Sequence, residues 1–168
     1  MNCSKVRVCL VVGVLLAPTG FASAQIVALG SSTVRGAVAE NEMWPAVLEG
    51  LLRAKGSQVH VVNAAVWGET TGATLARISS AVPDGTKIVI LAVNGYNDAN
   101  KLAEGAAHSA ANIAAIKNQL KARGIKVIDA QGIYSSVIRQ PGIAVADRIH
   151  LSVEGNKKVA ATLAGMLK

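Results

Sequence analysis

Short apolar runs alternate along the chain with segments in which apolar residues recur at helical spacing. The runs predict four strands, over residues 26–29, 59–65, 88–93 and 125–130. Helices are predicted behind Pro45, over Leu75–Val82, along the alanine-rich stretch from Ala106 to Leu120, and after Ser152, a candidate N-cap. This alternation predicts a mostly parallel, flavodoxin-like sheet with helices on both faces, which is a three-layer α/β/α sandwich.

Two segments add detail to this outline. The third run is apolar at every position from Ile88 to Val93, which is typical of a strand buried on both faces. The segment from Thr33 to Met43 is predicted as the one long loop, and it could flank a site. No repeat, linker or low-complexity segment indicates a second domain, so we expect one domain over residues 25–168.

Residues 1–24 are predicted to be a cleavable signal peptide. Lys5 and Arg7 accompany a short apolar run, and Ala22-Ser23-Ala24 resembles a small-residue cleavage site. The alternative is a membrane anchor, but the run from Val8 to Ala17 is about half of the roughly 20 residues that span a bilayer. We therefore expect cleavage after Ala24 and a periplasmic or secreted protein.

Composition limits the chemistry of the mature chain. Cys3 and Cys9 both lie in the predicted signal peptide, so neither a disulfide nor a thiol nucleophile remains. Losing two basic residues lowers the formal charge from +7 to +5, and the remaining basic residues are dispersed. Nucleic-acid binding would need a concentrated basic patch and stacking aromatic residues. We expect no nucleic-acid partner, no integral membrane anchor after cleavage, and a monomer.

Polar residues follow three of the predicted strands. Ser32 follows the first, Gly68 the second and Asn97 the third. The carboxyl ends of parallel strands meet at one edge of the sheet, where ligands bind in folds of this class. Each motif alone could be an ordinary polar turn. Their common place at strand ends is what indicates a site.

The residue types at these positions suit acyl transfer. A serine hydroxyl is a poor nucleophile until a base takes its proton, and His150 has a carboxylate, Asp147, three residues before it. His60 lies within a predicted strand and His108 in the alanine-rich helix, and His150 is the histidine with a carboxylate at orienting distance in the sequence. Gly68 offers an unobstructed backbone N–H and Asn97 offers side-chain donors for a developing oxyanion, while Asp98 is expected to brace its loop.

The four polar stretches together resemble the sequence blocks of the GDSL, or SGNH, hydrolase family. They are Leu29–Gly36, Asn63–Thr70, Gly95–Asp98 and Asp147–His150. The resemblance implies an SGNH-type fold with Ser32 as nucleophile, His150 as base and Asp147 as the third member of a triad. It also implies an oxyanion hole formed by the Ser32 N–H, the Gly68 N–H and the Asn97 side chain.

This chain departs from the family pattern at two positions. Ser31 stands where the family usually has aspartate before the nucleophile, and Leu151 stands where proline often follows the histidine. Neither change removes a group that the reaction requires. Trp67 and Tyr96 neighbour the candidate oxyanion donors, and we interpret them either as lining of a substrate pocket or as loop packing.

The resemblance implies hydrolysis of carboxylic esters or thioesters through an acyl-enzyme, of the lysophospholipase, arylesterase or acyl-thioesterase type. Carbohydrate O-acetyl esterase activity is the alternative within the family. A non-catalytic binding module with the same fold is the alternative outside it, and Ser31 is its only support.

No cofactor or metal is expected, because the sequence contains no His-Glu-x-x-His, paired-cysteine or phosphate-loop motif. The Gly-x-Ser-x-Gly elbow of α/β-hydrolases is also missing, since Val34 occupies its last position.

Overall fold

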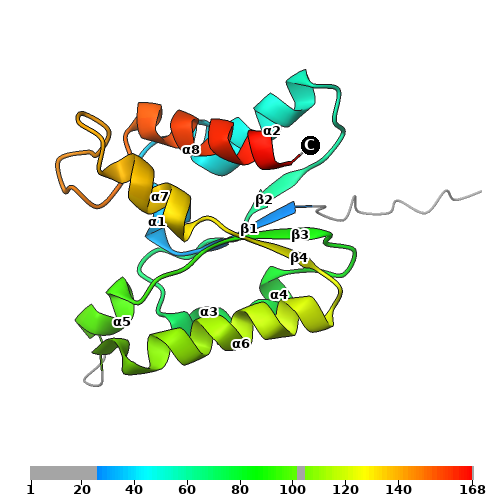
Figure 1. Cartoon of the computed structure of the whole chain (residues 1–168), viewed down its shortest axis with the longest axis vertical. Helices are drawn as coiled ribbons and strands as arrows, with labels where there is room; N and C mark the ends of the chain where they lie inside the picture. Colours follow the sequence, from blue (N-terminus) through cyan, green and yellow to red (C-terminus); the bar gives the residue numbers. More distant parts are fainter. Residues whose placement is uncertain (1–25, 102–104, 168) are drawn as a thin grey trace, which may run out of the picture.

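The computed structural model describes residues 26–101 and 105–167, and the predicted signal peptide lies outside them. A four-stranded parallel sheet forms the centre of the molecule (Figure 1). Its strands, in the spatial order β2-β1-β3-β4, are β1 (Ile26–Gly30), β2 (Val61–Asn63), β3 (Ile88–Ala92) and β4 (Lys126–Asp129). All four strands point the same way, so their carboxyl ends lie along one edge.

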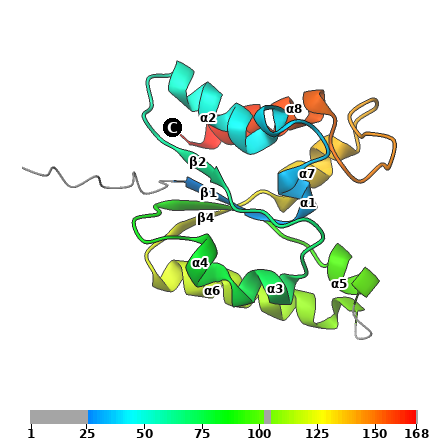
Figure 2. The same ribbon diagram turned by 180° about the vertical axis from the view of Figure 1, so that it is seen from behind.

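Helices cover both faces of the sheet, which confirms the predicted three-layer sandwich. One layer consists of α2 (Trp44–Ala54), α7 (Gln131–Ile138) and α8 (Val153–Met166), and the other consists of α3 (Thr71–Ala76), α4 (Ile78–Ala81) and α6 (Ser109–Ala122) (Figures 1 and 2). Each layer has its own apolar core, because alternate strand residues face opposite ways. Ala28 and Ile90 pack toward α2 and α8, whereas Val27 and Val89 pack toward α4 and α6.

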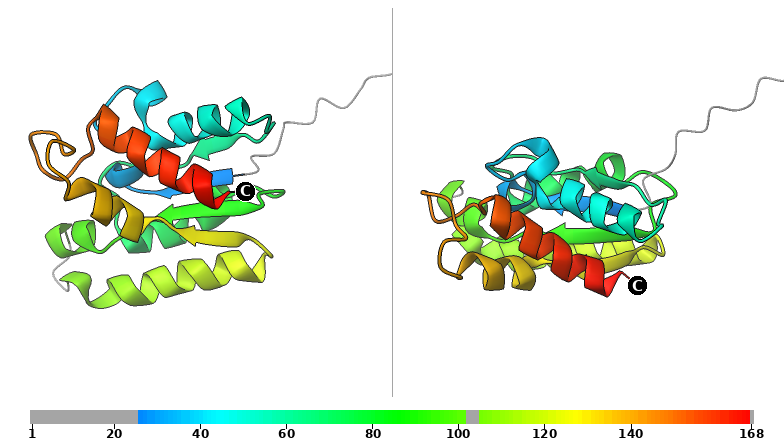
Figure 3. Two further views of the ribbon diagram at one scale, coloured as in Figure 1. Left: turned by 45° about the horizontal axis from the view of Figure 1, so that its top comes forward. Right: turned by 90° about the horizontal axis from the view of Figure 1, so that it is seen from above.

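The remaining short helices gather where the strands end. Helix α1 (Ser32–Arg35) follows β1 directly, and α5 (Tyr96–Lys101) follows β3. Figure 3 shows both helices at the same end of the molecule as the loop that precedes α8. This end carries the polar stretches that the sequence pattern singled out, so the fold brings them to one edge as expected.

Several element boundaries differ from the sequence-based prediction. The second strand is limited to Val61–Asn63, and the helix expected over residues 75–82 is two short helices that meet at Arg77. The side chain of Arg77 reaches back to Glu69, with Nε 2.5 Å and Nη2 2.6 Å from the carboxylate oxygens. The loop expected over 33–43 contains α1 and the 3-10 helix η1 (Glu40–Glu42), and a second 3-10 helix, η2 (Gly105–His108), precedes α6. Helices this short contain too few turns to show a 3.6-residue period.

A buried polar junction joins the starts of α2 and α8 and leads to the candidate site. The Trp44 backbone N–H donates to Asn156 Oδ1 at 2.9 Å, and the indole N–H of Trp44 donates to the Thr33 carbonyl at 3.3 Å. Asn156 Nδ2 donates to the Leu151 and Ser152 carbonyls. Ser152 caps α8 by accepting from the Gly155 N–H, which confirms its predicted role. The junction thus fixes the neighbours of both Ser32 and His150.

Candidate active site

Ser32 is the first residue of α1 and is held at the edge of the sheet by a sharp change of direction after β1. Gly30 ends β1 opposite Ala92, and a Cβ atom at Gly30 would lie 2.5 Å from the Ala92 carbonyl oxygen. Only glycine allows the two strands to approach this closely. The Thr33 hydroxyl then donates to the same carbonyl at 3.1 Å. Ser32 is half-buried at the start of α1, where these contacts hold the backbone around it.

The second polar stretch forms a tight loop that ends at the start of α3. Gly68 has φ 67°, a left-handed conformation that favours glycine, and the Lys101 ammonium donates to its carbonyl at 2.5 Å. A Cβ at Gly68 would also lie 2.9 Å from Lys101 Nζ. Among the described residues, the Gly68 N–H has no hydrogen-bond partner. It is therefore available to a ligand.

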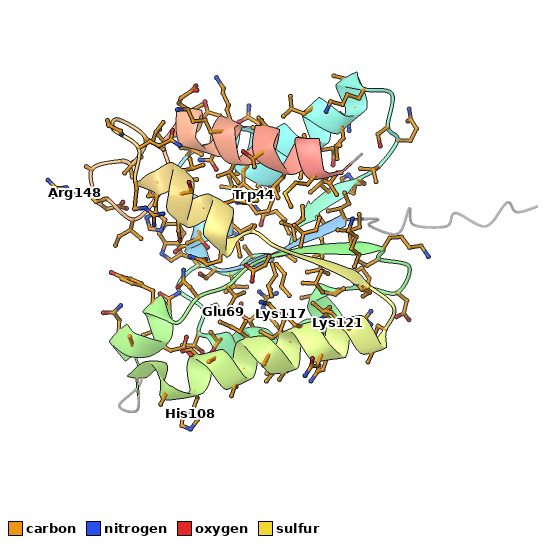
Figure 4. All side chains as sticks on the ribbon, viewed as in Figure 1. Trp44, Glu69, His108, Lys117, Lys121 and Arg148 are labelled. Carbon is orange, nitrogen blue, oxygen red and sulfur yellow. The ribbon has the colours of Figure 1, made fainter. Side chains whose placement is uncertain are left out.

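Asn97 is connected to this loop from α5. Its Nδ2 donates to the Glu69 carbonyl at 2.9 Å, which occupies one of its two amide protons. The next residue, Asp98, is fully buried and accepts from the N–H and the hydroxyl of Thr71, at 3.0 and 2.5 Å. This confirms the expected bracing role of Asp98. The carboxylate of Glu69 lies between the sheet and the α6 layer, where Arg77 neutralises it (Figure 4).

Asp147 and His150 lie in the loop that joins α7 to α8. Asp147 Oδ2 accepts from His150 Nδ1 at 2.6 Å, and Oδ1 accepts from the backbone N–H groups of Ile149 and His150 at 2.8 and 2.9 Å. The hydrogen bond from the His150 ring, followed by those two backbone N–H groups, lowers the pKa of the Asp147 carboxyl to about 2. One carboxylate therefore shapes the loop and fixes the imidazole.

A residue in the left-handed conformation and a hydrogen bond from α7 define the shape of this loop. Arg148 adopts φ 59°, which is uncommon for a residue with a side chain, and its side chain points away from the body of the molecule (Figure 4). Tyr134, from α7, donates its hydroxyl to the Ile149 carbonyl at 2.7 Å. Burial, and then the negative charge of Asp147, raise the pKa of the Tyr134 phenol, so it remains a donor well into alkaline pH. Sequence reasoning missed Tyr134 because nothing in its neighbourhood resembles a motif.

The free edge of the His150 ring is buried. His150 is 7% exposed, and its Nε2 has no hydrogen-bond partner among the described residues. A histidine whose Nδ1 is bound to a carboxylate presents Nε2 as its acceptor, which is the arrangement that a general base needs. The Trp67 ring stacks on this imidazole, with ring centroids 4.7 Å apart and planes inclined by 25°. The structure therefore shows no hydrogen bond between the Ser32 hydroxyl and His150 Nε2, and contact between the two remains a requirement of the reaction that the sequence predicts.

A cavity of about 240 Å³ opens beside Ser32 and Asn97. Its walls include Tyr96 from α5, Tyr134 and Ile138 from α7, and Ile149 from the histidine loop. Ser31 also lines it, so the residue that departs from the family pattern borders this space. Of the two aromatic residues named from the sequence, Tyr96 lines the cavity, whereas Trp67 is not part of its lining and contacts His150.

The other two histidines lie elsewhere. His60 Nδ1 is 2.7 Å from the Glu49 carboxylate beside the edge strand β2. His108 is exposed in η2 and projects from the outer side of the lower helix layer (Figure 4). Within residues 26–101 and 105–167, no three His, Cys, Asp or Glu side chains are grouped so as to hold a metal ion. In the same ranges, no helix has the length and apolar character needed to cross a membrane.

Comparisons with known proteins agree with this geometry. Residues 28–161 match the GDSL-like Lipase/Acylhydrolase family. The crystal structure of TesA superposes with a TM-score of 0.73 at 19% identity, covering 85% of this chain and 97% of that one. The structure of AlinE4, an SGNH-hydrolase family esterase, has a TM-score of 0.59 at 25% identity, and the match covers 86% of this chain and 95% of AlinE4. The structure of the esterase EstA from Pseudoalteromonas sp. has a TM-score of 0.64 at 13% identity, and the match covers 86% of this chain and 97% of EstA. A comparison with curated proteins finds no match.

The lowered pKa of Asp147 predicts how acid affects the fold. A carboxyl whose pKa is lower in the folded chain contributes stability that is fully present above its ordinary pKa of 3.8 and is lost as pH falls through about 2. The free energy of unfolding, measured in urea, should therefore be lower for Asp147→Asn than for the parent chain. The difference between the two should be largest above about pH 4 and should shrink toward about pH 2.

Asp84→Asn is the matched control, because the Asp84 side chain is fully exposed. If the difference in free energy of unfolding between the parent chain and Asp147→Asn stays constant from about pH 5 to about pH 2, the carboxylate does not hold the loop in solution.

Proposed function

This chain belongs to the GDSL-like lipase/acylhydrolase family and is an ester-hydrolysing enzyme, and on that premise we propose that it is a serine esterase. The reaction proceeds through an acyl-enzyme on Ser32. The observation that carries the proposal is the buried, unpartnered Nε2 of a histidine whose Nδ1 is held 2.6 Å from Asp147. Burying an imidazole nitrogen without a partner is unfavourable, so such an atom indicates a function beyond packing.

The first chemical step forms the acyl-enzyme. His150 Nε2 takes the proton from the Ser32 hydroxyl while Oγ attacks the carbonyl carbon of the ester. Asp147 keeps the proton on Nδ1, so Nε2 is the free acceptor, and its negative charge stabilises the imidazolium. The imidazolium then protonates the leaving alcohol or thiol. Water then attacks the acyl carbon as it gives a proton to Nε2. The bond from that carbon to Ser32 Oγ breaks, Nε2 returns the proton to Oγ, and the carboxylic acid leaves.

The oxyanion that forms during each half-reaction accepts from three donors in this proposal. Two are backbone groups, the N–H of Ser32 at the start of α1 and the N–H of Gly68. The third is the Asn97 amide, whose second proton is not used by the bond to Glu69. Preorganised donors of this kind stabilise the transition state because they need no reorientation as charge develops.

The cavity supports esters with short to medium acyl chains. Its volume of about 240 Å³ is below the roughly 300–1,000 Å³ of pockets that enclose drug-sized ligands. Tyr96, Ile138 and Ile149 provide apolar contact for an acyl chain, which suits lysophospholipid, aryl or simple acyl esters and thioesters. One wall is polar, since Asn94 Nδ2 donates to Gln131 Oε1 and Gln131 Nε2 donates to Ser135. That wall favours an acetylated carbohydrate as the second candidate substrate class.

We also propose that the enzyme acts in the periplasm or outside the cell, on the basis of the signal-like residues 1–24. One experiment tests export and nucleophile together. The full chain is expressed in a bacterial host, and the periplasmic fraction is treated with a fluorophosphonate probe. Intact mass should correspond to a chain that begins at Gln25 and carries one adduct, because an activated serine attacks phosphorus as it attacks a carbonyl.

Ser32→Ala should abolish labelling, and Ser136→Ala, an exposed serine on α7, should keep it. A folded protein that the probe leaves unmodified would support the non-catalytic binding module. An adduct on a chain that retains its first 24 residues would refute cleavage alone.

The oxyanion role of Asn97 has a matched control one turn along α5. Asn97→Ala should lower kcat on nitrophenyl esters by about 10² to 10³, because it removes one oxyanion donor. Asn100→Ala should retain a rate close to that of the parent chain, since Asn100 Nδ2 donates to the Tyr96 carbonyl on the exposed side of the helix. Equal values of kcat for the two variants would show that Asn97 is not an oxyanion donor. A series of acyl chain lengths, with acetylated sugars alongside, identifies the substrate class in the same assay.

A further inference from the structure

Trp67 is unusual among the large apolar side chains because it is both exposed and in contact with the base. It is 53% exposed, and its ring stacks on that of His150 with centroids 4.7 Å apart. It takes no part in either apolar core among the described residues. An exposed tryptophan gains little from burial, so its contact with the imidazole calls for another explanation.

The backbone around Trp67 is fixed on both sides. Before it, the Val66 N–H donates to the Gly30 carbonyl at 3.2 Å, which ties the loop to the end of β1. After it, the Gly68 carbonyl accepts from Lys101 of α5. The indole is therefore presented from a rigid loop, and its position over the imidazole does not depend on a flexible segment.

We infer that Trp67 is a positioning residue for the base, an inference that rests on the proposed function. Asp147 holds the Nδ1 edge of the ring, but a bond at one edge leaves the ring free to tilt about it. The indole covers one face and limits that tilt, which keeps Nε2 directed and shielded from water. An aromatic face also attracts a cation, so the indole stabilises the imidazolium that forms when Ser32 loses its proton.

The other charged and titratable groups near this ring lie on different residues, and replacing Trp67 removes none of them. Asp147 faces Nδ1, Tyr134 of α7 donates to the Ile149 carbonyl, and Lys101 of α5 donates to the Gly68 carbonyl. Arg148 is exposed and lines the cavity beside Ser32, so its positive charge is also near the site. A change in pH dependence on replacing Trp67 therefore reports the lost aromatic face.

The kinetic test compares Trp67→Leu with Trp67→Phe and with Tyr96→Leu. Trp67→Leu should lower kcat by roughly threefold to thirtyfold, with KM nearly unchanged, since the indole lies outside the cavity lining. In the pH profile of kcat/KM for Trp67→Leu, the acidic limb should move to lower pH, because the protonated base loses its aromatic neighbour. Trp67→Phe should restore most of both properties. Tyr96→Leu removes an equally exposed aromatic residue that lines the cavity, and should raise KM without moving the acidic limb.

A second readout does not depend on turnover. Protonated imidazole quenches a stacked indole, so the emission of Trp67 should fall as His150 becomes protonated. The step should be missing in His150→Gln and in Trp67→Phe, where buried Trp44 supplies the remaining signal. A step that persists in His150→Gln, or an acidic limb that Trp67→Leu leaves in place, would overturn the inference. If ester hydrolysis does not depend on Ser32 but the emission step is present, the Trp67–His150 stack exists in solution and the proposed mechanism is wrong.

Discussion

The site depends on a single carboxylate. Asp147 accepts two backbone N–H groups through one oxygen and the imidazole Nδ1 through the other, so the same side chain shapes the loop and orients the His150 ring. Charge-assisted hydrogen bonds of this kind are stronger than neutral ones, which explains how a partly exposed residue can determine the geometry around it. Without the Asp147 carboxylate, fewer hydrogen bonds would hold the backbone around Arg148 in its left-handed conformation. The imidazole would also lose the bond that directs Nε2.

The parallel sheet supplies the other constraint. Because all four strands end along one edge, residues from distant parts of the sequence meet there without any long excursion of the chain. The junction of Trp44 and Asn156 then couples the two halves of the site, since it binds the Thr33 carbonyl on one side and the Leu151 carbonyl on the other. Ser32 and His150 are thus each next to a residue that the same buried network holds.

Sequence reasoning was sufficient where the determinants are local or periodic. Strand runs such as 88–93, the cap at Ser152 and the bracing aspartate Asp98 all follow from residue type and position, and the structure confirms them. It missed α7, although α7 supplies Tyr134 and part of the cavity, because an eight-residue helix shows little periodicity and its hydrogen bond to Ile149 is formed only in three dimensions. Trp67 was placed near the site from its neighbour Gly68, but its stacking on His150 depends on loop geometry that no sequence pattern encodes.

In the proposed mechanism, Ser32, His150 and the oxyanion donors act on one reacting group. A crystal structure of the phosphonylated enzyme tests this most directly. We expect phosphorus bonded to Ser32 Oγ, with one phosphonyl oxygen within hydrogen-bond distance of the Ser32 N–H, the Gly68 N–H and Asn97 Nδ2, and with His150 Nε2 facing Oγ. Phosphorus on another residue, or a phosphonyl oxygen that none of these donors reaches, would contradict the account.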